Sequence, residues 1–116
     1  DSVRTALLDA LESGAQLILT TGGTGVGPRD RTPEGTRSVL DRQLPGVMEL
    51  LRARGAAASV HAALTRGIAG VVDARDGAGG ALVVNLPGSP KAALEGIEVV
   101  LPLVRHVLDQ LVGGDH

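Results

Sequence analysis

The chain has 116 residues, of which 43% are hydrophobic and 21% are charged, the size and composition of one globular domain with a modest core. Its 11 basic and 13 acidic residues give a net charge of −2, which excludes binding of nucleic acid or of an anionic membrane by bulk electrostatics. The absence of cysteine excludes disulfides, thiol catalysis and thiolate metal sites, and the absence of Phe, Tyr and Trp excludes aromatic stacking platforms. No apolar stretch reaches the roughly 18 residues of a membrane helix and no signal peptide is visible, so we expect a single cytoplasmic domain over residues 1–116.

The N-terminal part of the chain predicts a helix, a strand and a loop. Apolar residues recur at helical spacing from Ser2 to about Ser13, which predicts an amphipathic helix with Gly14 just past its last turn. The short apolar run 17–21 is typical of a buried parallel strand. Residues 22–28 follow it as a glycine-rich loop.

Two further helices are predicted in the middle of the chain. Thr32 is expected to be the N-cap of the first, with Pro33 at its first helical position. Residues 44–46 (Leu-Pro-Gly) break the pattern, and the next helix is expected to end near Gly55. The stretch 56–63 is compatible with a helix or with extended chain.

The C-terminal part predicts a strand and a long helix. Residues 81–86 form the clearest strand of the sequence, after a turn at 76–80, and the loop 87–90 leads into a helix over 91–112. The residues of this helix that we expect to face inward are Leu94, Ile97, Leu101, Val104 and Leu108.

Alternating strands and helices indicate the fold class. They predict an α/β protein, a three-layer α/β/α sandwich with a mainly parallel sheet. Such domains usually begin with a strand, whereas this chain begins with a helix. We therefore expect the first strand or strands to lie upstream and to be absent from this chain.

The loop after the first strand is one candidate binding site, because ligands of open α/β sheets bind at the carboxyl ends of strands. The run 20–25 (Thr-Thr-Gly-Gly-Thr-Gly) offers backbone N–H groups and hydroxyls to a phosphate or a polar ring, although a tight connection remains equally open. It is neither a Walker A loop nor a dinucleotide fingerprint. The pair Arg29-Asp30 follows. Asp30 is either functional, as a ligand of metal-bound water or as a polariser of an attacking group, or part of a solvated turn.

The loop after the last strand is the second candidate. In the run 85–91 (Asn-Leu-Pro-Gly-Ser-Pro-Lys), Lys91 stands at a helix N-terminus, where its charge opposes the helix dipole. Either an anionic ligand or plain solvation explains it. Arg66 is a candidate phosphate clamp or a surface arginine. His61, His106 and His116 have no metal-ligand spacing.

These motifs together resemble the MogA/MoaB family of molybdopterin-binding, molybdopterin adenylyltransferase-like proteins, which includes the gephyrin G domain. The resemblance rests on residues 20–25 and 28–34, on 44–46 (Leu-Pro-Gly), on 64–70 (Leu-Thr-Arg-Gly-Ile-Ala-Gly) and on 83–91. These motifs occur in order and span the chain from its start to its C-terminal part. Together they are highly specific, whereas any one glycine loop would be weak.

The resemblance implies an α/β/α domain that assembles as a trimer, or as a hexamer in the MoaB branch, and acts in molybdenum cofactor biosynthesis. It implies transfer of AMP from Mg-ATP to the terminal phosphate of molybdopterin, with Asp30 helping to hold Mg²⁺ and aligning the nucleophilic phosphate. The binding residues it implies are Thr20, Thr21, Gly22, Gly23, Thr24, Gly25, Arg29, Thr32, Glu34, Arg66, Asn85, Pro87, Gly88, Ser89 and Lys91. The partners are small-molecule ligands and copies of the same chain, with no nucleic acid and no membrane.

Three departures keep a second function open. Family members carry roughly another 50 residues before this point, by comparison with a usual domain length, and a further functional aspartate lies in that part. The usual Leu-Ser-Arg is Leu-Thr-Arg at 64–66, and typical adenylyltransferases have a serine near Gly55. The alternative is a MoaB-like protein that binds or carries molybdopterin or a related pterin with little turnover. A third hypothesis is a fragment of a larger cofactor-synthesis polypeptide.

Overall fold

The computed structural model describes residues 2–75 and 79–113. Its elements in chain order are α1 (Ser2–Glu12), β1 (Leu17–Thr21), α2 (Thr32–Arg37), β2 (Arg42–Gln43), α3 (Pro45–Ala56), the 3₁₀ helix η1 (Val60–Leu64), β3 (Ala69–Val72), β4 (Ala81–Leu86) and α4 (Pro90–Leu111). Among the residues described, no helix is long and apolar enough to cross a membrane.

The four described strands form one sheet in the order β1-β4-β3-β2. β1 runs parallel to β4, whereas β3 is antiparallel to both β4 and β2. The α/β class is confirmed, and the pairing is mixed where the sequence suggested a mainly parallel sheet. The reason is the connection 73–80 between β3 and β4, which is shorter than the dozen or so residues that a parallel crossover needs.

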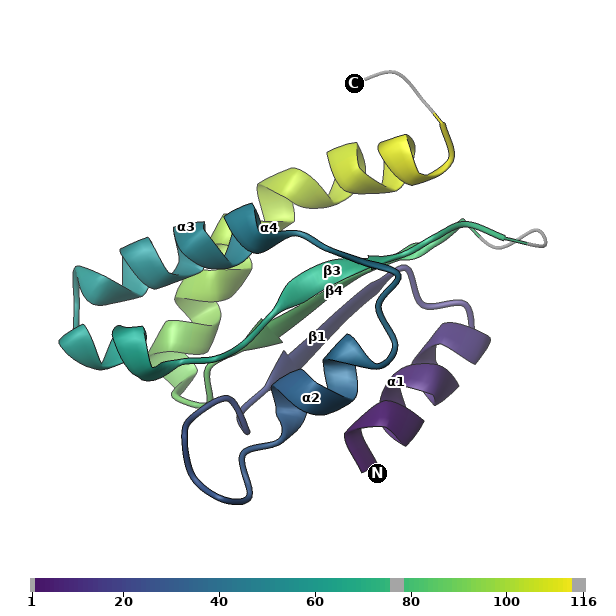
Figure 1. Cartoon of the computed structure of the whole chain (residues 1–116). Helices are drawn as coiled ribbons and strands as arrows, with labels where there is room; N and C mark the ends of the chain where they lie inside the picture. The colour runs from purple at the N-terminus through teal and green to yellow at the C-terminus, as the bar shows by residue number, and fades with distance from the viewer. Residues whose placement is uncertain (1, 76–78, 114–116) are drawn as a thin grey trace.

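The helices cover both faces of this sheet. In Figure 1, α1 and α2 lie on one face, and α3 and α4 lie on the other. All six residues of β4 are buried, as expected for a central strand enclosed between two helical layers. The main core cluster joins the α3–α4 layer to the sheet and consists of Val47, Met48, Leu51, Ala69, Val71, Leu82, Val84, Leu86 and Val100.

Most predicted elements are confirmed, with shifts at their ends. β1 and β4 have the predicted bounds, and α1 ends one residue early. The N-cap of α2 is Arg31, with no side-chain cap bond, so the prediction for Thr32 is wrong by one residue. Pro45 begins α3 instead of separating it from the preceding segment, because proline is well tolerated in a first turn. β2 and β3 were not predicted.

The predicted inward face of α4 is wrong at two leucines. The side chains of Leu94 and Leu101 are 63% and 56% exposed, whereas Gly96 and Val100 are buried. Because α4 carries apolar residues on more than one side, its spacing does not decide which side meets the sheet. Residues 76–78 of the predicted turn at 76–80, and His116, lie outside the described residues.

Candidate functional site

The two candidate loops meet at one end of the sheet, because β1 pairs in parallel with β4. The backbone N–H of Gly22 donates to the carbonyl oxygen of Leu86 at 3.0 Å. A Cβ atom on Gly88 would lie 3.3 Å from the Cα atom of Gly22, so the loops touch through glycine backbone. Gly22 and Gly23 also have φ of +83° and +69°, a left-handed conformation that glycine adopts without a steric penalty.

A cavity of about 420 Å³ opens beside this junction, between α3, η1, the start of α4 and the two loops. Met48 and Leu51 of α3 and Ala62 of η1 give it an apolar wall. Five of the predicted site residues line the cavity, and these are Thr24, Asn85, Pro87, Ser89 and Lys91. Its size suits a small organic ligand, and its combination of an apolar wall with a few polar groups is typical of such sites.

The glycine loop offers free backbone donors beside the cavity. The N–H groups of Gly22 and Gly27 donate to protein oxygens. Within the described part of the chain, the four N–H groups between them, from Gly23 to Val26, donate to no protein acceptor. Successive unpaired N–H groups of a loop form a concavity that favours anions. This supports the predicted use of the loop for phosphate.

Asp30 holds this loop closed. Its Oδ2 atom accepts the N–H of Gly27 at 2.9 Å, and its own N–H donates to the carbonyl oxygen of Gly27 at 3.0 Å. Its Oδ1 atom has no protein partner among residues 2–75 and 79–113. No group of three or more metal-ligating side chains occurs in those same ranges. Mg²⁺ usually takes one or two carboxylates together with substrate phosphates and waters, so a single carboxylate here fits Mg²⁺ only when it arrives with a phosphate ligand.

Arg66 is occupied by protein partners rather than free to clamp a phosphate. Its Nε atom donates to the carbonyl oxygen of Gly25 at 2.8 Å, and Nη2 donates to that of Asp30 at 2.7 Å. Its Nη1 atom donates to Glu34 Oε2 at 2.7 Å. This hydrogen bond lowers the pKa of the Glu34 carboxyl below its usual value and raises the pKa of Arg66. Arg66 thus ties the end of the 64–67 segment to the glycine loop and to α2.

Asn85 lies beneath the site and is fully buried. Its Oδ1 atom accepts the N–H of Ile68 at 3.0 Å, and its Nδ2 atom donates to the hydroxyls of Thr20 and Thr36, both at 2.9 Å. The amide therefore has its partners within the protein and joins β1, α2 and β4. Thr20 shares this structural role, although both residues were predicted to bind the ligand.

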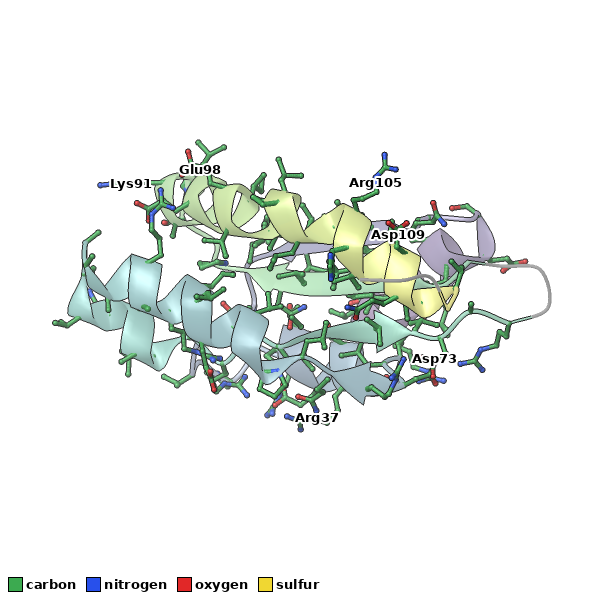
Figure 2. All side chains as sticks on the ribbon, turned by 90° about the horizontal axis from the view of Figure 1, so that it is seen from above. Arg37, Asp73, Lys91, Glu98, Arg105 and Asp109 are labelled. Carbon is green, nitrogen blue, oxygen red and sulfur yellow. The ribbon has the colours of Figure 1, made fainter. Side chains whose placement is uncertain are left out.

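The remaining predicted residues occupy different positions around the loops. Thr32 is buried, and its hydroxyl lies where a side chain on Gly23 would be, 2.2 Å from an added Cβ atom. Ser89 caps α4 by accepting the N–H of Ala92 at 3.2 Å. Thr21, Arg29, Glu34 and Lys91 are exposed. Figure 2 shows the Lys91 side chain pointing outward from the start of α4, at the opposite end of the molecule from Asp73.

Comparison with known proteins identifies the family of the chain. Residues 1–106 match the family described as "Probable molybdopterin binding domain". The chain is 41% identical to the molybdopterin biosynthesis Mog protein of Mycobacterium ulcerans, with a TM-score of 0.83 over 95% of this chain and 68% of that one. It is 50% identical to the molybdopterin biosynthesis enzyme MoaB of Thermus thermophilus, with a TM-score of 0.79 over 97% of this chain and 67% of that one. The chain belongs to the MogA/MoaB family.

Relatives of this family are longer than the chain. The molybdopterin adenylyltransferase of Helicobacter pylori is 38% identical over 102 residues, which are 88% of this chain and 54% of that protein. The chain spans about half of that relative and a smaller share of other curated relatives, which are named for molybdenum cofactor biosynthesis or synthesis. The family and its place in molybdenum cofactor biosynthesis thus agree with the motifs.

Several cavity residues of this family member were missed from the sequence. Arg52 of α3 donates to the carbonyl oxygens of Thr65 and Gly67, at 3.2 and 2.8 Å, and so fixes the segment before β3. His61 and Glu95 also line the cavity. No sequence signal identified His61, because it stands alone in the stretch 56–63, whose secondary structure the sequence left ambiguous.

Proposed function

We propose that the chain carries the molybdopterin site of a molybdopterin adenylyltransferase. The observation that carries this proposal is the row of unpaired N–H groups from Gly23 to Val26, in a loop whose Thr24 lines a cavity with an apolar wall. Such a site accommodates a phosphate attached to a ring system, which is the chemistry of molybdopterin. Two relatives named molybdopterin adenylyltransferase, at 38% and 43% identity, support the same function.

In the proposed reaction, a terminal phosphate oxygen of molybdopterin attacks the α-phosphorus of ATP. A new P–O bond forms, the bond between the α-phosphorus and the bridging oxygen breaks, and pyrophosphate leaves with that electron pair. Positioning and charge neutralisation supply most of the catalysis in such transfers. The loop N–H groups orient the attacking phosphate, and the Asp30 carboxylate lies beside them to align it.

Mg²⁺ would enter with ATP, held by Asp30 and by phosphate oxygens. The ion supplies neutralisation of the charge on the phosphates. Asp30 thereby combines two roles, since one of its oxygens already closes the glycine loop onto Gly27. Loss of its negative charge is expected to weaken transfer much more than pterin binding.

A second candidate is a MoaB-like protein that binds molybdopterin without efficient transfer. Two observations favour it, namely the 50% identity to a MoaB enzyme and the lack of any group of three or more metal-ligating side chains among the residues described. For either function we propose a homo-oligomer, a trimer or a hexamer. The exposed leucines Leu94 and Leu101 on α4 support association, because isolated monomers rarely expose large apolar patches.

An assay with molybdopterin and Mg-ATP separates the two candidates. We expect adenylylated product and pyrophosphate from the unaltered protein, and product loss of about a hundredfold or more in Asp30→Asn with pterin binding nearly retained. The control is Asp109→Asn, an exposed change on the far part of α4 (Figure 2), which is expected to leave both unchanged. Binding without product would favour the MoaB-like carrier, and turnover in Asp30→Asn would refute the role of Asp30.

A further inference from the structure

We infer that Arg66 is the positioning residue of the anion site, which orients the peptide planes of the glycine loop without contacting the ligand. This inference rests on the proposed use of that loop for a phosphate. Three backbone carbonyls converge on this one residue. The Arg66 N–H donates to Thr24 at 2.7 Å, while its guanidinium donates to Gly25 at 2.8 Å and to Asp30 at 2.7 Å.

The direction of these carbonyls sets the direction of the loop donors. In a trans peptide, the N–H of the following residue points opposite to the carbonyl, and the described chain has no cis peptide bonds. The carbonyls of Thr24 and Gly25 point toward Arg66, so the N–H groups of Gly25 and Val26 point away from it. These are two of the four N–H groups without a protein acceptor. The carbonyl groups, which are the negative ends of these peptide dipoles, therefore bind Arg66. The N–H groups, which are the positive ends, stay available to an anion.

Only a guanidinium can do this at the observed spacing. The three acceptors of the side chain lie on the loop, on Asp30 and on Glu34 of α2, and each meets a different nitrogen of one rigid planar group. Lysine offers one nitrogen at the end of a flexible stem and cannot hold three separated acceptors in that fork. A lysine at this position keeps the positive charge but loses the geometry.

The same contacts connect the loop to Asp30. Arg66 holds the Asp30 carbonyl, and the Asp30 carboxylate accepts the N–H of Gly27. The loop is thus fixed from both sides, by Arg66 at Gly25 and by Asp30 at Gly27. Displacement of Arg66 is expected to disturb the donors from Gly23 to Val26 and the carboxylate together, while β1 and β4 keep their pairing.

The test is a titration of the ¹⁵N-labelled protein with inorganic pyrophosphate, followed by NMR. We expect the amide signals of Gly23 to Val26 to move, while the Nε–H signal of Arg66 stays in place because its acceptor is a carbonyl of the protein. In Arg66→Lys we expect pyrophosphate affinity to fall about tenfold or more, the loss of one or two good hydrogen bonds at the cradle. Arg54→Lys is the matched control, since Arg54 pairs with Glu98 on the exposed surface, and its affinity should stay within about twofold.

Several outcomes would overturn the inference. A charge-only role predicts that Arg66→Lys binds pyrophosphate like the unaltered protein. A direct ligand role predicts that the Arg66 Nε–H signal moves with the titration, a measurement that does not depend on any variant folding. Loop amides that do not respond would remove the anion cradle itself. Amide signals of Leu82 to Asn85 in Arg66→Lys report whether the sheet is intact.

Failure of the proposed function gives a different pattern. If the protein makes no adenylylated product but binds pyrophosphate through the loop in an Arg66-dependent way, the transferase proposal fails and the positioning role stands. If product forms in the unaltered protein and in Arg66→Lys with equal kcat and KM, the transferase proposal stands and the positioning role fails.

Discussion

At the scale of single residues, the buried amide of Asn85 holds three elements together below the ligand loops. Replacement by alanine leaves the N–H of Ile68 without its acceptor and removes the donor to Thr20 and Thr36. Each buried polar group left unpaired costs about 1–3 kcal/mol. We expect Asn85→Ala to lower the free energy of unfolding by about 2–4 kcal/mol, combining these losses.

Urea unfolding followed by circular dichroism measures this change. The control is Gln110→Ala, an exposed amide on α4, which should alter the free energy of unfolding by less than about 0.5 kcal/mol. Equal stability of Asn85→Ala and the unaltered protein would show that water replaces the lost partners.

Residues of the site differ in how far the sequence predicts them. The sequence placed the glycine loop and the loop after β4 at the carboxyl ends of strands, where ligands of open α/β sheets bind, and the family resemblance implied that both bind the same ligand. The partners of Arg66 were not predictable in this way, since Gly25 is separated from it by 41 positions. Its clamp role was an interpretation of charge alone. In the fold, its guanidinium donates to the carbonyls of Gly25 and Asp30 and to the carboxylate of Glu34.

At the scale of elements, the two-residue strand β2 is held against β3 by close backbone contact at Gly70. A Cβ atom there would lie 2.3 Å from the carbonyl oxygen of Arg42 and 2.6 Å from a methyl carbon of Leu40. The Arg42 backbone cannot move aside as a flexible side chain can. We expect Gly70→Ala to lower the free energy of unfolding by about 1–3 kcal/mol through overpacking.

Gly46→Ala is the matched control within the same segment. Gly46 lies in the first turn of α3, and an added Cβ atom there meets no atom within 4 Å. Alanine favours the helix over glycine by up to about 1 kcal/mol, so this variant should be neutral or more stable in the same urea titration. If both variants changed the free energy of unfolding equally, the contact between β2 and β3 would not explain why position 70 requires glycine.

The sequence predicts long elements better than short ones for physical reasons. β1 and β4 are mostly apolar runs between turn residues, and that pattern identifies buried strands. β2 has two exposed residues, and β3 contains Gly70, so neither carries a periodic signal. α4 was found, but two of its five predicted inward residues, Leu94 and Leu101, are exposed because they extend a second apolar side.

At the scale of the whole molecule, β1 forms one edge of the sheet and β2 forms the other. β1 pairs with β4 on one side, and no strand of the described chain pairs with its other side. Leu17, Ile18 and Leu19 are only partly buried, although they form one of the most apolar runs in the chain. The ligand loops begin at the end of this edge strand, so its order matters for the site as well as for stability.

Hydrogen exchange tests whether this edge is open in solution. The Gly22 N–H donates to Leu86, and the Gln16 carbonyl accepts from Leu82. Because N–H directions alternate along a strand, the amides of Ile18 and Thr20 point toward β4 and those of Leu17 and Leu19 point to the open edge. We expect Leu19 to exchange about a hundredfold faster than Thr20, since only the latter needs an opening of the sheet. Equal protection of the Leu19 and Thr20 amides that is lost on dilution would show that a second copy of the chain pairs with β1. Equal protection at every protein concentration would contradict an open edge at β1.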